Sequence, residues 1–392
     1  MATLFDAVDL LRERRQLPTS GTVRVKDLLQ RFRPSYPSHP GSVRALLLKI
    51  EGFLPTTRWA IVIVTQTGIP SVTSLPLYWF ERLFNDGDGV ATYIRQMSGN
   101  RQVFTWRVFG PLQGYTPEKK AELATQGAAA ESIYLRAEAA KQSIINDVSD
   151  FDRFFWVIDQ PGASGGTSGG GDIFIAARDV TQQIVSHEIC HAFGVVFEGD
   201  KYDGSKVQTY GDSFCQMDNG PSARSFPNER MAYTQDGDEH RTTGPVMCAA
   251  HLFVVNWLDY DNNVVEHTAE ASKSDIVIDA NQGAPAIGRH NKVALTIGPV
   301  PRNNNETQLW VEFRSPLGFD RFVDRPVSTD NVDMPQGALV MHEMRTDRHV
   351  ILVGLSPAKR GNSLQIPGSG QSVEIVNINT TLRNVRLRIR AT

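Results

Sequence analysis

Two histidines and a glutamate form the motif H-E-x-x-H at residues 187–191. An α-helix advances about 100° per residue, so His187 and His191 lie one turn apart on the same face and can bind one Zn²⁺ ion. Glu188 lies beside that face, where its carboxylate can accept a proton from a water molecule. The motif therefore predicts a zinc centre with two histidine ligands and Glu188 as the catalytic general base and general acid.

The stretch from Asp179 to Gly194 has the features of one helix that positions these residues. Asp179 and Gln182 could form a capping box at its start, and Gly194 could end it. Apolar residues recur along the stretch: Val180, Ile184, Ile189 and Phe193. This pattern predicts a half-buried helix, in which two stacked histidines need a purpose such as metal binding. The alternative is a surface helix with incidental histidines.

The third protein ligand is not given by the motif. A catalytic zinc site usually has three protein ligands and a water molecule. In the metzincin pattern H-E-x-x-H-x-x-G-x-x-H a third histidine follows the glycine, but here that position is Phe197, which cannot bind zinc. The next carboxylates are Glu198 and Asp200, either of which could fold back after Gly194 and bind the metal.

The segments around the motif resemble the immune inhibitor A-like zinc peptidases. Three segments carry the resemblance: HEICHAFGVVFEGDKYD from residue 187, GDSFCQMDNG at 211–220 and VMCAAHLFVVNWLDY at 246–260. With further segments, such as WAIVIVTQT from Trp59, the similarity covers roughly residues 55–345. It implies an H-E-x-x-H peptidase of metzincin-like (zincin) fold.

The resemblance also implies roles for residues outside the helix. Met217 would be the methionine of a turn beneath the zinc. The acidic tail after the motif slightly favours Asp200 over Glu198 as third ligand. A tyrosine would stabilise the oxyanion of the reaction, and three tyrosines are candidates: Tyr202, Tyr210 and Tyr233.

A short apolar strand is expected just before the helix, at residues 172–177. It follows a glycine-rich run at 161–171, which is more typical of a flexible flap than of a phosphate-binding loop. An extended substrate could pair with the edge of this strand. The candidate substrate-binding residues are Asp172, Ile173, Phe174 and Ile175.

The chain has three cysteines, too few for a disulfide framework. Cys190 lies inside the motif, and we expect a small buried hydrophobic residue there, with a redox-sensitive thiol as the alternative. His240 and His251 could line the cleft, although a single histidine is more often structural.

Three acidic turns could hold a structural Ca²⁺ ion: residues 85–89, 235–240 and 260–263. The first lacks the remaining ligands and the closing glutamate of a calcium loop, and the other two are no stronger. We therefore expect ordinary turns, with Ca²⁺ binding as the alternative.

Three regions differ in their patterns. Residues 1–50 predict a helical extension, with a pro-segment as the alternative. Residues 51–263 alternate strands with helices, as in an α/β (α+β) zincin-like catalytic domain with a mixed, mostly parallel sheet. Residues 264–392 alternate short strands with turns, which predicts an all-β, sandwich-like domain.

Composition limits the partners. The net charge of −3 gives no electrostatic reason to expect nucleic acid or a membrane surface. The N-terminus lacks the apolar segment of a secretory signal, and no run is long enough to cross a bilayer. The sequence as written therefore predicts a soluble, cytoplasmic protein of open oligomeric state, with secretion through a missing leader or an unconventional route as the alternative.

Together these features predict a zinc-dependent endopeptidase, a hydrolase whose partner is a polypeptide substrate. The main alternative is a non-catalytic glycan- or protein-binding protein with a structural or vestigial zinc site, an interpretation favoured by Phe197. A zinc hydrolase that acts on another bond is a further alternative, because the motif specifies how water is activated rather than which bond is cleaved.

Overall fold

The computed structural model describes residues 21–24, 53–66, 76–85, 87, 89–159, 166–169, 172–217, 226–227, 234–235, 238–239, 242–255, 257–267, 275–286, 289–298, 306–321 and 334–391. The helical extension expected at residues 1–50 lies outside these ranges, except for strand β1 (Gly21–Arg24). Tyr233 and His240 also lie outside the described residues.

The chain forms two compact units. Unit 1 comprises Met1–Arg95, Arg101–Gly194 and Asn228–Arg241, and unit 2 comprises Gln96–Asn100, Val195–Pro227 and Thr242–Thr392. The main division falls at Gly194 instead of the expected residue 263. The reason is strand pairing: β7 (Asp200–Tyr202) pairs in parallel with β18 (Val350–Pro357), so the segment after the motif helix joins the C-terminal strands.

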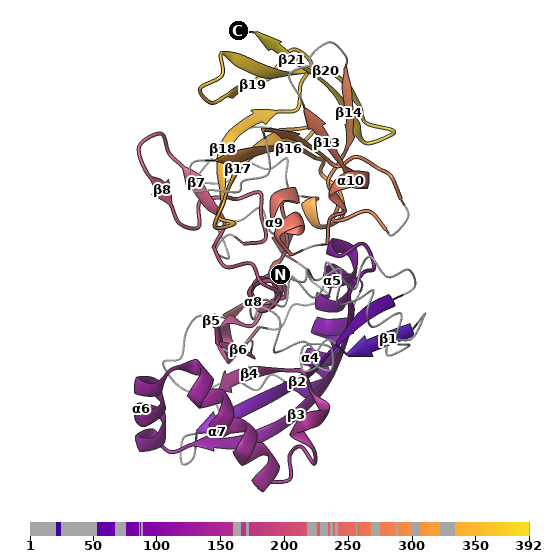
Figure 1. Cartoon of the computed structure of the whole chain (residues 1–392). Coiled ribbons are helices and arrows are strands. Elements are labelled where there is room, and N and C mark those ends of the chain that lie inside the picture. The colour runs from indigo at the N-terminus through magenta and orange to yellow at the C-terminus, as the bar shows by residue number, and fades with distance from the viewer. Residues whose placement is uncertain are drawn as a thin grey trace, which may run out of the picture. The chain divides into compact units, whose positions relative to one another are not determined.

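Unit 1 contains a six-stranded sheet (Figure 1). Its other strands are β2 (Phe53–Gln66), β3 (Val103–Tyr115), β4 (Arg153–Asp159), β5 (Gly166–Gly169) and β6 (Asp172–Ala176). The order is β1-β2-β4-β6-β5, with β3 also paired to β2. All pairs are parallel except β5 with β6. The apolar run from Trp59 is thus a central strand, as its β-branched composition predicts.

Helices cover both faces of this sheet. Helices α6 (Pro117–Gln126) and α7 (Ala128–Lys141) bury Leu123 and Leu135 against Ala60, Val62 and Trp156 on one face. Helix α4 (Leu77–Asn85) contributes Phe84, whose ring packs against Phe104, Trp106 and Phe155 on strands β3 and β4. Alternate residues of one strand point to opposite faces, so both faces become apolar core. Unit 1 is therefore a mixed α/β structure.

Three further elements complete unit 1 and its border. Helix α5 spans Val90–Met97, and a small hairpin joins β10 (Thr234–Gln235) to β11 (Asp238–Glu239).

Among the described residues, no helix has the length and apolarity needed to span a bilayer.

Unit 2 contains two main sheets. The larger has the order β13-β15-β16-β17-β18-β7-β8, and the smaller has the order β14-β21-β20-β19. The strands not yet given are β8 (Val207–Gln208), β13 (Val264–His267), β14 (Ile276–Asp279), β15 (Ala294–Ile297), β16 (Thr307–Arg314), β17 (Ala338–Arg345), β19 (Ser363–Ile366), β20 (Gln371–Asn379) and β21 (Asn384–Ala391). Short strands β9 (Phe226–Pro227) and β12 (Thr242–Thr243) form a separate pair.

Both sheets of unit 2 contribute to one hydrophobic core. Val311 and Met341 come from the larger sheet, and Ile278, Val373 and Leu387 from the smaller. This shared core fits the predicted β-sandwich. Two short helices precede it, α9 (Ala249–Val254) and α10 (Tyr260–Asn263).

Candidate metal centre

The motif lies on helix α8 (Gln182–Ala192) of unit 1. The predicted cap was wrong, because Asp179 belongs to a preceding 3-10 turn at Ala177–Asp179. Thr181 caps the helix instead, and its hydroxyl oxygen accepts the backbone N–H of Ile184 at 3.1 Å. Gly194 follows the helix with a φ of 108°, a conformation that glycine adopts without strain, so the predicted end is confirmed.

The two histidines of α8 meet at their metal-binding atoms. His187 Nε2 and His191 Nε2 are 3.0 Å apart, and the rings cross at 78°. In a tetrahedral zinc site with Zn–N bonds of about 2.0–2.1 Å, two ligand nitrogens are about 3.3 Å apart. The observed pair is therefore within a few tenths of an ångström of the separation that zinc requires.

The motif residues lie on a well-packed helix. His187 is 8% exposed and Glu188 is 7% exposed, whereas His191 is half-buried. Helix α8 lies against β5 and β6 of the same unit. The Gln182 amide donates to Ser186 Oγ at 2.9 Å on the buried side of the helix. This packing fixes the directions of the two imidazoles and the neighbouring carboxylate.

The expected substrate edge is corrected by the sheet topology. Strand β6, with Asp172, Ile173, Phe174 and Ile175, pairs with β4 on one side and with β5 on the other. Its backbone is therefore not available to an added strand. The glycine-rich run supplies β5, which among the described residues is the outermost strand on this side of the sheet, and its sequence has no apolar pattern that predicts a strand.

Asp172 has a structural environment. Its carboxylate accepts Arg136 Nη2 at 2.6 Å, the backbone N–H of Phe154 at 3.0 Å and the hydroxyl of Ser132. The side chain is buried, so this network joins α7 to the sheet. A role for Asp172 in contacting substrate is not supported by these bonds.

The two candidate third ligands follow Gly194 and belong to unit 2. The Asp200 carboxylate is 5% exposed and accepts His349 Nε2 at 2.6 Å. Phe197 stacks on the same imidazole, with ring centroids 4.4 Å apart. Asp200 and Phe197 thus both contact His349, a contact across 149 residues that the sequence did not predict.

Other predicted site residues lie in unit 2. Met217 is buried at the end of a turn, and its carbonyl accepts the N–H of Gly199 at 2.6 Å. Tyr202 is exposed and donates to the carbonyl of Gly204 at 3.1 Å, and Tyr210 is also exposed. The proposed role of either tyrosine stays a prediction.

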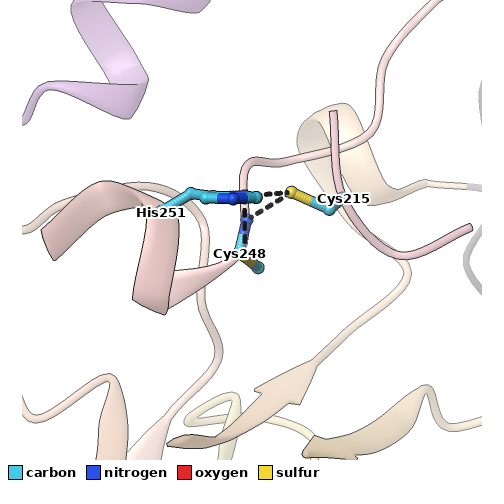
Figure 2. Close-up of side chains that lie close together, drawn as sticks. All are labelled: Cys215, Cys248 and His251. Carbon is cyan, nitrogen blue, oxygen red and sulfur yellow. Dashed lines mark hydrogen bonds between the residues drawn. The ribbon is translucent and has the colours of Figure 1, made fainter. Parts of the chain in front are cut away.

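The sequence did not predict one buried group of sulfur and nitrogen donors. Cys215, Cys248 and His251 lie together in unit 2, each with no exposed surface (Figure 2). For His251 a structural role was the main expectation and a place in the cleft the alternative; its imidazole lies within 3.2–3.3 Å of both sulfurs. The local signal was Cys248-x-x-His251, but Cys215 is 33 residues away from Cys248, so spacing alone did not join them.

The two thiols differ in acidity. Burial raises the pKa of Cys215, but the hydrogen bond from Cys248 and the charge of His251 outweigh it and bring that pKa well below its usual range. Burial, followed by the interaction with Cys215, raises the pKa of Cys248. One thiolate can therefore exist inside this group.

The acidic turn at residues 260–263 forms helix α10. Asp259 caps this helix by accepting the N–H of Asn262. Among the described residues, the side-chain groups able to hold a metal do not include this turn. Calcium binding there is not supported, and parts of the turns at 85–89 and 235–240 lie outside the described residues.

No model of a known protein family matches the chain, and no curated protein matches it. A proposal for the function of this protein therefore rests on the geometry and chemistry of the site.

Proposed function

We propose that this protein is a zinc-dependent endopeptidase whose centre is helix α8. The main support is the 3.0 Å separation of His187 Nε2 and His191 Nε2 on a buried helix, with Glu188 next in sequence. Two imidazole nitrogens this close are suited to bind one cation between them. The parallel sheet with one antiparallel outer strand beside α8 also supports the zincin-like fold expected from the sequence.

Zinc, when bound, would polarise the scissile carbonyl and lower the pKa of water towards about 7. Glu188 would accept a proton from the attacking water molecule. It would then deliver that proton to the nitrogen of the departing amine, acting first as base and then as acid. The low exposure of Glu188 keeps competing water away from its carboxylate.

We infer that Glu198 is the third ligand. Asp200 was slightly favoured by sequence, but its carboxylate already accepts a 2.6 Å hydrogen bond from His349 in unit 2. This hydrogen bond holds the buried Asp200 carboxylate against His349, which disfavours turning it towards a zinc ion on α8. Glu198 follows Gly194 by four residues, and four residues span at most about 14 Å, so the chain keeps it within reach of the end of α8.

The substrate class is an extended polypeptide. Strand β5 is outermost in the described sheet and lies against α8. An unpaired strand edge presents alternating N–H and C=O groups, which bind an extended backbone with little regard to its side chains. We infer that β5 takes the role first expected of β6.

Digestion of casein, with and without a chelator, tests the activity. We expect chelator-sensitive cleavage, and Glu188→Gln should retain zinc while losing about 10²- to 10⁴-fold in rate. Glu122→Gln is a matched control, because Glu122 is 52% exposed on α6. Glu188→Gln activity equal to that of the wild type would refute the mechanism. A wild-type protein that binds zinc but cleaves nothing would favour the non-catalytic alternative.

A further inference from the structure

Cys215, Cys248 and His251 bring three metal-ligating atoms together inside unit 2. Cys215 lies in the turn that ends at Met217, and Cys248 is the N-cap of α9, on whose first turn His251 lies. The His251 Nδ1 atom is 3.2 Å from Cys215 Sγ and 3.3 Å from Cys248 Sγ. Figure 2 shows the imidazole directed at Cys215, with Cys248 beside it.

These separations fit one tetrahedral ion. With Zn–S bonds of about 2.3 Å and Zn–N bonds of about 2.0 Å, a ligand sulfur and nitrogen are about 3.5 Å apart. Both observed Nδ1–Sγ distances are within about 0.3 Å of this value. The nearly equal approach of His251 to the two sulfurs is what a shared cation requires.

The environment of the group favours a structural role. All three side chains are fully buried, so no substrate can reach a thiolate there. The backbone N–H of Cys248 points at Cys215 Sγ at 3.3 Å, an amide–sulfur contact of the kind that supports a thiolate ligand. Within the described part of the chain, His251 Nε2 has no hydrogen-bond partner, and the other ring nitrogen, Nδ1, contacts the two sulfurs.

A buried network holds the two cysteine segments in place. Arg314 donates to the carbonyl of Phe214, the residue before Cys215, and to the carbonyl of Val246 at 2.9 Å, just before Cys248. Glu312 accepts the N–H of Ala249, the residue after Cys248, at 2.8 Å. The donors are therefore fixed in position before any ion binds, which lowers the entropic cost of binding.

We propose that Cys215, Cys248 and His251 bind a second zinc ion, which stabilises unit 2 and takes no part in peptide cleavage. Thiolate and imidazole donors together select zinc over calcium or magnesium, which prefer oxygen. Cys215, Cys248 and His251 supply three of the ligands. Asp212 is a carboxylate near Cys248, since its oxygen, Cys248 Sγ and a ring nitrogen of His342 lie within 4.8 Å of one another, and His342 Nε2 donates to it at 2.9 Å. Four protein ligands are typical of a closed structural site.

The zinc content of the purified full-length protein, measured by mass spectrometry of the metal, tests the proposal. We expect two zinc ions per chain in the wild type and one in His187→Ala/His191→Ala. Cys215→Ser/Cys248→Ser should also retain one. Cys190→Ala is the matched cysteine control and should retain two. If His187→Ala/His191→Ala retains no zinc, the proposal of the second site is overturned, and the proposal of the α8 centre is unaffected. If this variant retains one zinc ion, the second site is supported, even when the wild-type protein shows no peptidase activity.

A thiol titration covers the case in which Cys215→Ser/Cys248→Ser does not fold. In the variant Cys190→Ala/His187→Ala/His191→Ala, the only cysteines are Cys215 and Cys248. An organomercurial that blocks thiols should release one zinc ion per two thiols, detected with a metal-sensitive dye. Blocking both thiols without zinc release would overturn the proposal. So would the absence of titratable thiols in the denatured, unreduced variant, since that result indicates a disulfide.

Discussion

Replacing Arg314 with alanine would disrupt a fully buried charge network of unit 2. The guanidinium has no exposed surface and donates to Asp320 from Nε and Nη2, at 2.6 Å each. It also donates to Glu312 at 3.2 Å and to the carbonyls of Phe214 and Val246. Although burial lowers the pKa of Arg314, Asp320 and then Glu312 raise it well above its usual range. The side chain is therefore charged throughout the working pH range.

The expected cost follows from what the truncation leaves behind. Removing one partner of a buried ion pair typically costs about 3–5 kcal/mol, because the other charge stays buried without compensation. Asp320 would keep the N–H of Val246 at 3.0 Å, and Glu312 would keep the N–H of Ala249 and the amide of Asn281 at 2.6 Å. These remaining donors reduce the loss, so we expect about 3 kcal/mol, the lower end of that range.

Urea unfolding of the full-length protein, followed by tryptophan fluorescence, measures this loss. Trp257 and Trp310 are fully buried in unit 2 and report on it. Arg388→Ala is the matched control, because Arg388 is 42% exposed and pairs with Asp275 at 2.7 Å. An exposed pair contributes about 0–1 kcal/mol. If Arg314→Ala and Arg388→Ala unfold at the same urea concentration, the buried network does not stabilise unit 2 and the reasoning fails.

Two further predictions concern the segment that follows the motif. Glu198→Ala should raise the dissociation constant of the zinc held by α8 at least about 100-fold. Removing a residue that only hydrogen-bonds to a metal ligand lowers metal affinity by up to about 100-fold, and removing a ligand should cost at least as much. Asp200→Ala should leave that zinc bound, and metal titration of both variants decides between them; zinc loss in Asp200→Ala alone would reverse the assignment. Asp203 has its pKa lowered to about 2 by the N–H groups of Lys206 and Ser205 and by the Ser205 hydroxyl. Its folded pKa lies below the unfolded value, so its contribution to stability is present above about pH 4 and is lost as the pH falls through about 2. A carboxyl titration by NMR should give this low midpoint and Ser205→Ala should raise it, whereas an ordinary midpoint in the wild type would contradict the turn geometry.

Local sequence patterns determined the elements that carry the chemistry. The spacing of His187 and His191 predicts their shared helical face because four residues make one helical turn, whatever the rest of the fold. Gly194 as the helix end, the central strand from Trp59 and the all-β pattern after residue 264 are local in the same way. In each case the information lies within a few neighbouring residues, so the sequence is sufficient.

The remaining features depend on contacts between residues that are far apart in the sequence. Which strand lies outermost depends on β5 folding back on β6, and its glycine-rich sequence has no apolar alternation to predict it. The hydrogen bond that holds the Asp200 carboxylate comes from His349, which is 149 residues away in the sequence. The Cys215–Cys248–His251 group forms because Arg314 and Glu312, on a strand far along the chain, hold two distant segments side by side. Such contacts depend on how whole sheets and loops pack, and no short stretch of sequence carries that information.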